Sequence, residues 1–423
     1  MLKLQNNRLF SLGGISNFFL CLFVVFVIFP LKFLVSSSTL YQTGGFVPFV
    51  SQYLYAADIC FLLGILFVGL DFAFNKNHTF EFRDLKFDRN LLFLSAFFVF
   101  FSVVSIFFSN NLGNSFFSLL RFFEFFILYL LLIFELVNFK LMIKTFLGAV
   151  LFASVLGLFQ FILQHSLGLK ILGESVVSNS MVGVAKLQLF DFKLLRAYGT
   201  FAHPNIFSGF LAISLIFIYF FYKKEFFVKN KLSILVLFLL LAVFLLTFSK
   251  TTLVAFILLP FFLFQKKFTP KLKLFLLAMT GVLLVLALIS EVTTLERVRF
   301  LSISGKLFVD KPFGVGLGNF TEAMSQFSYY KLFPWNYQPV HNVFLLALNE
   351  IGFAGLISLL LIFAYGIYET LKSKEYILFA LIFVLMIISL FDHYPFSLYQ
   401  GQFLFWFVMA YVTKSRNQPI CDL

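Results

Sequence analysis

The dominant pattern in this chain is a series of apolar runs near the length that crosses a membrane, separated by shorter polar connections. About twelve runs are candidate membrane-spanning helices, at roughly 17–35, 50–72, 91–108, 116–134, 145–163, 203–221, 232–247, 252–264, 274–290, 340–363, 377–391 and 398–412. No soluble domain interrupts the series. We therefore predict an all-α fold, a polytopic helical bundle in which residues 1–423 form a single membrane domain.

Composition supports a membrane setting. Hydrophobic residues make up 61% of the chain and charged residues only 12%, and the mean hydropathy is +0.98. Such a chain has too little polar surface to cover a soluble globule. The net charge of +13 would favour nucleic acid as the partner of a soluble protein. Here the charges lie in the connections, so we predict membrane lipids as the surroundings and no nucleic-acid partner.

The placement of lysine and arginine predicts which connections face the cytoplasm. With the N-terminus inside, every inner connection is basic, whereas the outer connection 109–115 has no lysine or arginine. The basic residues of the inner connections are Lys76, Arg83, Lys86, Arg89, Lys140, Lys144, Lys223, Lys224, Lys229, Lys231, Lys266, Lys267, Lys271, Lys273, Lys372, Lys374, Lys414 and Arg416. The alternation supports both the span count and the orientation.

Two outer segments are too long to be simple links: a first extracytoplasmic loop at 164–202 and a large one at 291–339. Long loops in compact bundles are usually functional or disordered. The second contains Pro312, Trp335 and several glycines and aromatic residues, which is not a disordered composition. It predicts a folded cap lying on the membrane.

Five cationic or titratable side chains from four separate stretches are assigned to the outer side: Arg196, Lys250, Arg297, Arg299 and His341. They indicate an anionic partner, and a guanidinium matches phosphate oxygens with two hydrogen bonds. A lipid diphosphate in the outer leaflet fits this chemistry. No Asp-x-Asp pair is present that would hold a divalent cation against a diphosphate, so we predict no metal and no cofactor, with the cations taking the role of a metal.

For several polar residues, the sequence allows a structural role as well as a functional one. His341 alone could anchor a helix at the interface, and Pro204 and Asn205 after His203 are typical of a helix start. The glycine-rich run 312–320 could cradle phosphate with its N–H groups, although a structural turn is the favoured interpretation. Within the spans, Arg121 and Glu124 are expected to pair structurally, while the role of Asp58 stays open.

Three stretches together resemble the bacterial O-antigen ligase and O-antigen polymerase superfamily of polytopic membrane glycosyltransferases. They are Arg196–Asn205 (RAYGTFAHPN), the run 312–320 (PFGVGLGNF) with its preceding arginine, and the helix start His341–Gly355 with Asn342, Glu350 and Gly352. The resemblance covers about residues 190–365. One position departs from the pattern, because Lys250 follows Ser249 where the family often shows arginine.

The resemblance implies metal-independent, inverting transfer of a glycan from a polyprenyl diphosphate donor. It implies that Arg196 and an arginine at the head of the large loop hold the diphosphate, and that His341 is the base toward the acceptor hydroxyl. We expect His203, Asn205, Asn342 and Glu350 to support the site. It also implies a bacterial cytoplasmic (inner) membrane with the active site on the extracytoplasmic side. The sequence leaves open whether the loop arginine is Arg297 or Arg299.

Elementary chemistry agrees with that mechanism. A diphosphate is a good leaving group, so cations that hold its developing charge serve better than an acid. A neutral imidazole can take the proton of the attacking hydroxyl. We expect His341 to be this base, with His203 ranked second.

Other hypotheses remain open at this stage. A transporter or lipid-linked glycan flippase is the main alternative, since about twelve spans is a common count for transporters. A non-catalytic scaffold of a polysaccharide assembly complex is a third. The sequence does not separate ligase from polymerase, nor does it identify the sugar, the oligomeric state or the acceptor, which could be lipid A core, a lipid-linked glycan or a protein.

Overall fold

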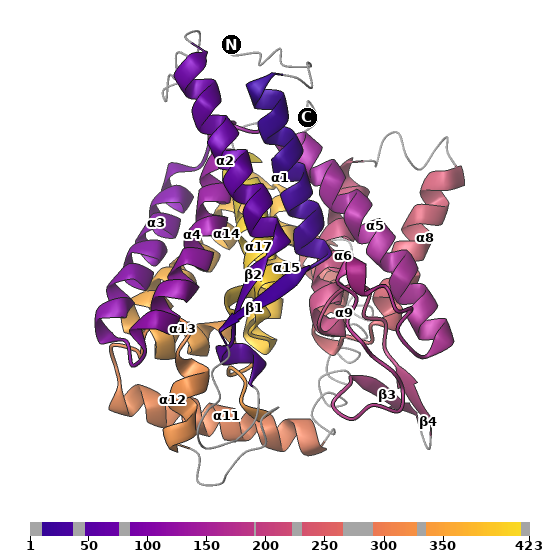
Figure 1. Cartoon of the computed structure of the whole chain (residues 1–423), viewed down its shortest axis with the longest axis vertical. Helices are drawn as coiled ribbons and strands as arrows, with labels where there is room; N and C mark the ends of the chain where they lie inside the picture. The colour runs from indigo at the N-terminus through magenta and orange to yellow at the C-terminus, as the bar shows by residue number, and fades with distance from the viewer. Residues whose placement is uncertain are drawn as a thin grey trace.

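The structure is a computed structural model of the whole chain, and it describes residues 11–36, 47–75, 85–189, 192–221, 231–264, 291–327 and 336–415. These residues are mainly helical (Figure 1). The α-helices are α1 (Leu12–Ile28), α2 (Ala56–Phe74), α3 (Arg89–Val104), α4 (Leu112–Ile133), α5 (Phe139–Leu163), α6 (Pro204–Phe221), α8 (Lys231–Leu246), α9 (Lys250–Phe264), α11 (Glu291–Asp310), α12 (Phe320–Phe327), α13 (Val343–Ile351), α14 (Phe353–Ser373), α15 (Tyr376–Phe391), α16 (Tyr394–Ser397) and α17 (Tyr399–Ser415).

Short strands and 3₁₀ turns lie between the helices. Strand β1 (Lys32–Ser36) pairs antiparallel with β2 (Gln52–Tyr55), and β3 (Lys186–Leu189) pairs antiparallel with β4 (Phe192–Leu195). The 3₁₀ turns are η1 (Pro48–Val50), η2 (Ser105–Phe108) and η3 (Lys170–Leu172). The prediction of a helical bundle is thus confirmed, and two small two-stranded sheets are added to it.

Polar residues begin several helices where the apolar runs start. The side-chain oxygens of Asp88, Asn111, Asn138 and Asn342 accept hydrogen bonds from backbone N–H groups in the first turns of α3, α4, α5 and α13. These N–H groups have no partner within the helix, so a side-chain acceptor satisfies them. Asn342, predicted to support the site, is therefore the N-cap of α13.

Among the described residues, five helices are long and apolar enough to cross a membrane: Ala56–Phe74, Arg89–Phe108, Leu112–Ile133, Phe139–Leu163 and Phe353–Ser373. Shorter apolar helices include α1, α6, α8, α9 and α15. Several long apolar helices indicate a membrane-embedded protein. The predicted span 274–290 lies outside the described residues.

The predicted span 340–363 is not one helix. Helix α13 ends at Ile351 and α14 begins at Phe353, and Gly352 between them has φ +84°. A Cβ atom at Gly352 would lie 2.7 Å from the backbone carbonyl carbon and oxygen of Phe313. The break between the two helices lets the backbone at Phe313 pack against Gly352. Glycine fits here because it has no Cβ atom and adopts a positive φ without strain.

The two ends of the bundle collect different segments. At one end, Asp88 N–H donates to Thr413 O (2.8 Å), and Lys414 pairs with Glu135, all in or next to the predicted inner connections. At the other end, Asn110 N–H donates to Val315 O (3.0 Å) and Ala197 N–H donates to Leu246 O (3.1 Å). The predicted outer connections thus meet at one end, opposite the first turns of α1 in Figure 1.

The large segment 291–339 is folded in its described part rather than an open loop. Helix α11 runs across the lower end of the bundle in Figure 1, with α12 beside it. Phe300 and Leu307 on α11 are buried, which fastens this helix to the core. The sequence predicted a folded cap here, and it did not predict a helix as long as α11.

Candidate functional site

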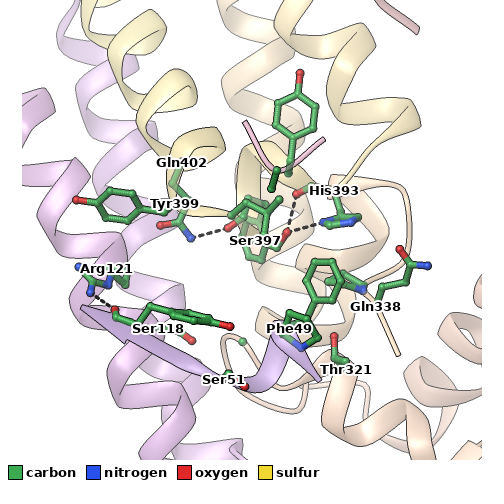
Figure 2. Close-up of a pocket in the computed structure, with 18 of the residues that line it drawn as sticks. Phe49, Ser51, Ser118, Arg121, Thr321, Gln338, His393, Ser397, Tyr399 and Gln402 are labelled. Atoms are coloured by element: carbon green, nitrogen blue, oxygen red, sulfur yellow. Dashed lines mark hydrogen bonds between the residues drawn. The ribbon is translucent and has the colours of Figure 1, made fainter. Parts of the chain in front are cut away.

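A cavity of about 380 Å³ opens at the end of the bundle where the predicted outer connections meet. Its walls come from η1 and β2, from α4, from the glycine-rich run, from the segment before α13 and from the α15–α17 connection. Figure 2 shows Arg121, Ser118 and Tyr399 on one side, His393, Gln338 and Thr321 on the other, and Ser397 between them. Of the predicted site residues, it is lined by His203, Asn205, His341 and Glu350.

His341 lies beside two residues that the sequence analysis did not single out. Its Nδ1 is 3.8 Å from Asp392 Oδ1, just beyond hydrogen-bond range, and its ring centroid is 5.1 Å from that of His393. Asp392 ends α15 and His393 follows it, so a short connection supplies both. His341 therefore has a carboxylate within reach and an open side toward the cavity.

Burial and neighbouring charges act on the groups around His341. Burial opposes ionisation of Asp392, yet its pKa is lowered because His341 interacts with the carboxylate. Burial lowers the pKa of His393 to about 3. His393 is thus neutral near pH 7, and Asp392 is the anion of this group.

Arg196 is connected to this group through Asn205. Its Nε donates to Thr247 O (2.5 Å) and its Nη2 donates to Asn205 Oδ1 (2.7 Å), while Asn205 Nδ2 donates to Asp392 Oδ2 (3.1 Å). Burial lowers the pKa of Arg196 to about 10, so the guanidinium stays charged near pH 7. Asn205, predicted to support the site, therefore joins the arginine to the histidine–aspartate group.

His203 has a structural role at the start of a helix, which was the alternative to a role as the catalytic base. Its Nδ1 accepts a hydrogen bond from Asn205 N–H (3.1 Å) at the start of α6. Burial, with the charge of Arg196, lowers its pKa to about 3. A buried neutral imidazole whose Nδ1 is already an acceptor is less suited to be the base than His341.

The predicted diphosphate-binding cations do not line the cavity but lie in part together. Burial and the positive charges of Arg196 and Arg297 lower the pKa of Lys250, so these three cations lie near one another. Arg299 is exposed two positions further along α11. The arrangement brings together a cation group of Arg196, Lys250 and Arg297, and it favours Arg297 over Arg299 as the loop arginine.

The glycine-rich run is a structural turn and not a phosphate cradle. Gly318 N–H donates to Glu350 Oε2 (2.7 Å) and Phe320 N–H donates to Glu350 Oε1 (3.2 Å). Val315 N–H and Gly316 N–H donate to the backbone of α13. Because these donors are satisfied inside the protein, they are not free for an anion, and Glu350 supports the turn.

A second charged group lies deeper in the helices. Arg121 on α4 pairs with Asp58 on α2 and with Glu124 (3.0 Å). Tyr399 Oη lies 2.9 Å from an oxygen of each carboxyl group, and its single O–H can donate to one of them at a time. The expected Arg121–Glu124 pair is present, and Asp58, left open by the sequence, is its third member.

Sequence reasoning missed Asp392 and His393. They stand between the last two apolar runs in a stretch that resembled a short link. An acid–histidine pair followed by Tyr394 and Pro395, at the outer end of an apolar run, was the available signal. With His341 they form a group whose ligand atoms could hold a metal ion.

The chain matches no protein-family model and no curated protein.

Proposed function

We propose that this protein is a membrane glycosyltransferase of the O-antigen ligase and polymerase type. It would transfer a glycan from a polyprenyl diphosphate to an acceptor hydroxyl on the extracytoplasmic side. The observation that carries the proposal is the meeting of His341, Arg196 and Asp392 from three distant stretches at one end of an apolar helical bundle, beside a cavity. A lipid-linked diphosphate needs this combination of charge and membrane access.

The residues divide into two roles. His341 takes the proton of the acceptor hydroxyl as its oxygen bonds to the anomeric carbon, and the bond from that carbon to the diphosphate oxygen breaks. The departing diphosphate keeps the electron pair, and the cation group of Arg196, Lys250 and Arg297 stabilises its charge. Attack from the face opposite the leaving group inverts the anomeric configuration. Asp392 lies where it stabilises the protonated imidazole.

A transporter or lipid-linked glycan flippase is the second candidate, and two observations favour it. The Arg121 group places charges inside the spans, and α13 and α14 form a broken helix at Gly352. The glycosyltransferase is preferred because the histidines and Asp392 gather at one end of the bundle. A flippase would move labelled lipid-linked glycan across vesicles without forming a new glycosidic bond.

The decisive measurement is transfer by purified protein with a lipid-linked glycan donor and acceptor in the presence of chelator. We expect His341→Ala to abolish transfer while the protein stays folded and binds donor, and His203→Ala to retain measurable activity. Transfer at the wild-type rate by His341→Ala would refute the assignment. Activity that appears only when a divalent cation is added would refute the metal-independent mechanism.

Sidedness has its own test. Ser180 and Gln326 are exposed and lie in the two predicted extracytoplasmic segments. Cysteines placed at these positions should react with a membrane-impermeant maleimide added to intact cells. Labelling of both only from the cytoplasmic side, in inverted vesicles, would place the site on the wrong side for an exported lipid-linked donor.

A further inference from the structure

Three side chains with metal-ligating atoms meet at the wall of the cavity. One ligand atom from each of His341, Asp392 and His393 lies within 4.8 Å of the others. All three residues line the cavity, so an ion bound among them would have an open side. Proton transfer to His341 does not require His393, and its presence in the group is unexplained by the proposed reaction.

The atoms around this group are arranged as in a metal site. His393 Nδ1 lies 2.6 Å from Ser397 Oγ, which leaves Nε2 as its ligand atom. Asp392 Oδ2 accepts from Asn205 Nδ2 (3.1 Å), which holds the carboxylate in place. His341 Nδ1 is buried and has no hydrogen-bond partner among the described residues. Outer hydrogen bonds of this kind orient histidine and carboxylate ligands.

We propose that His341, Asp392 and His393 bind a divalent transition-metal ion of the Zn²⁺ class, with the cavity supplying the fourth position. Two imidazoles and one carboxylate suit Zn²⁺, whereas Ca²⁺ and Mg²⁺ prefer oxygen ligands alone. In a tetrahedral zinc site the ligand atoms lie about 3.3 Å apart. The ligand atoms lie within 4.8 Å of one another, so binding would require them to move closer together.

Metal binding would inhibit the proposed transferase. A neutral imidazole has one nitrogen lone pair, so a His341 that donates it to Zn²⁺ cannot accept the proton of a hydroxyl. This consequence rests on the proposed function, whereas the binding site itself does not. The two can therefore fail separately in the experiment.

The binding test uses the full-length protein, purified in detergent through a tag without histidine and freed of metal with chelator. Titration with Co²⁺ should give visible d–d bands that saturate at one ion per chain, and Zn²⁺ should displace them. His393→Gln should lose the bands. Ser397→Ala, which removes only an outer partner, should weaken Co²⁺ binding by about 10- to 100-fold.

The matched control is His165→Gln. His165 is an exposed histidine in the first extracytoplasmic segment, and its Nδ1 faces its neighbour's backbone, 2.7 Å from Ser166 O. This variant should bind Co²⁺ as the wild type does. Equal binding by wild type and His393→Gln, or no bands from the wild type with Co²⁺ in excess, would overturn the proposal. If His393→Gln does not fold, the wild-type titration and Ser397→Ala decide the question.

The inhibition is measured as the ratio of transfer rates with and without Zn²⁺ at a concentration that saturates the site. The wild type should lose transfer and recover it with chelator, whereas His393→Gln should lose its sensitivity to Zn²⁺ whatever its basal rate. If no transfer occurs under any condition, the proposed function is refuted. The Co²⁺ titration still tests the binding site independently. Saturating Zn²⁺ without effect on wild-type transfer would remove the inhibitory role.

Discussion

Two arginines near the same cavity are held in opposite ways. Arg121 contacts two carboxylates, Asp58 and Glu124, and one guanidinium nitrogen also donates to Tyr53 O (2.5 Å). Arg196 donates to two neutral acceptors, a backbone carbonyl and the side-chain amide of Asn205. The first arginine contacts two carboxyl groups directly, whereas the second reaches a carboxylate only through an amide.

The difference separates an arginine that contacts carboxyl groups directly from one whose printed hydrogen bonds go to neutral acceptors. A charge inside a membrane helix is costly unless it is paired, and the pairing of Arg121 joins α2, α4 and α17. Arg196 instead lies in a connection, next to Lys250 and Arg297, where positive charge is in excess. We infer that Arg121 maintains the fold around the cavity and that Arg196 serves an anionic substrate.

The largest effect is predicted for Arg121, whose replacement tests whether its ion pairs stabilise the fold. Arg121→Met leaves Asp58 and Glu124 buried without a counter-ion, and breaking a buried pair in this way costs about 3–5 kcal/mol. We expect a large loss of stability, measured by denaturant unfolding of the purified protein in detergent. The triple variant Arg121→Met, Asp58→Asn, Glu124→Gln removes all the charges and should recover part of the loss. A single variant as stable as the wild type would show that the ion pairs do not hold these helices.

For Arg196, we predict that Arg196→Lys lowers the transfer rate without lowering the free energy of unfolding. Arg196→Lys replaces a planar fork by a point charge, and losing one preorganised contact to developing charge costs about 3–4 kcal/mol, or roughly two to three decades in rate. The measurement is transfer at equal protein concentration, with unfolding as the companion. Lys250→Arg, which keeps the charge, is the matched control and should be tolerated. Normal transfer by Arg196→Lys would argue against a diphosphate clamp.

Helices could be predicted from the sequence because lipid and core both demand apolar side chains over a fixed length. The eleven predicted spans that fall on described residues each overlap a helix. The break at Gly352 could not be predicted, because it depends on a backbone contact with Phe313, 39 positions away in sequence. Helix α11 was missed because its mixed composition gives no apolar run.

The candidate site was predictable in part. Charge and position indicated His341 and Arg196, and the structure brings both to one end of the bundle. Asp392 and His393 could not be joined to them by spacing, since only the packing of α13 beside α15 brings position 341 next to position 392. For the glycine run the sequence favoured a structural turn over a phosphate cradle, and its hydrogen bonds to Glu350 confirm the turn.

The smallest loss of transfer rate is predicted for changes on α11, where either Arg297 or Arg299 belongs to the cation group. Arg297 acts on Lys250, while Arg299, also exposed, lies two positions along the same helix. Residues two apart on a helix do not share a face. Arg297→Gln should therefore remove one charged contact to the diphosphate, worth about 1.5–3 kcal/mol, or roughly 10- to 100-fold in transfer rate. The effect of Arg299→Gln on transfer should stay within about 0.5 kcal/mol, as most surface changes do.

Rates measured at saturating acceptor with the donor varied would assign the effect to donor binding and turnover. A larger loss in Arg299→Gln than in Arg297→Gln would exclude Arg297 from the cation group and reassign the loop arginine.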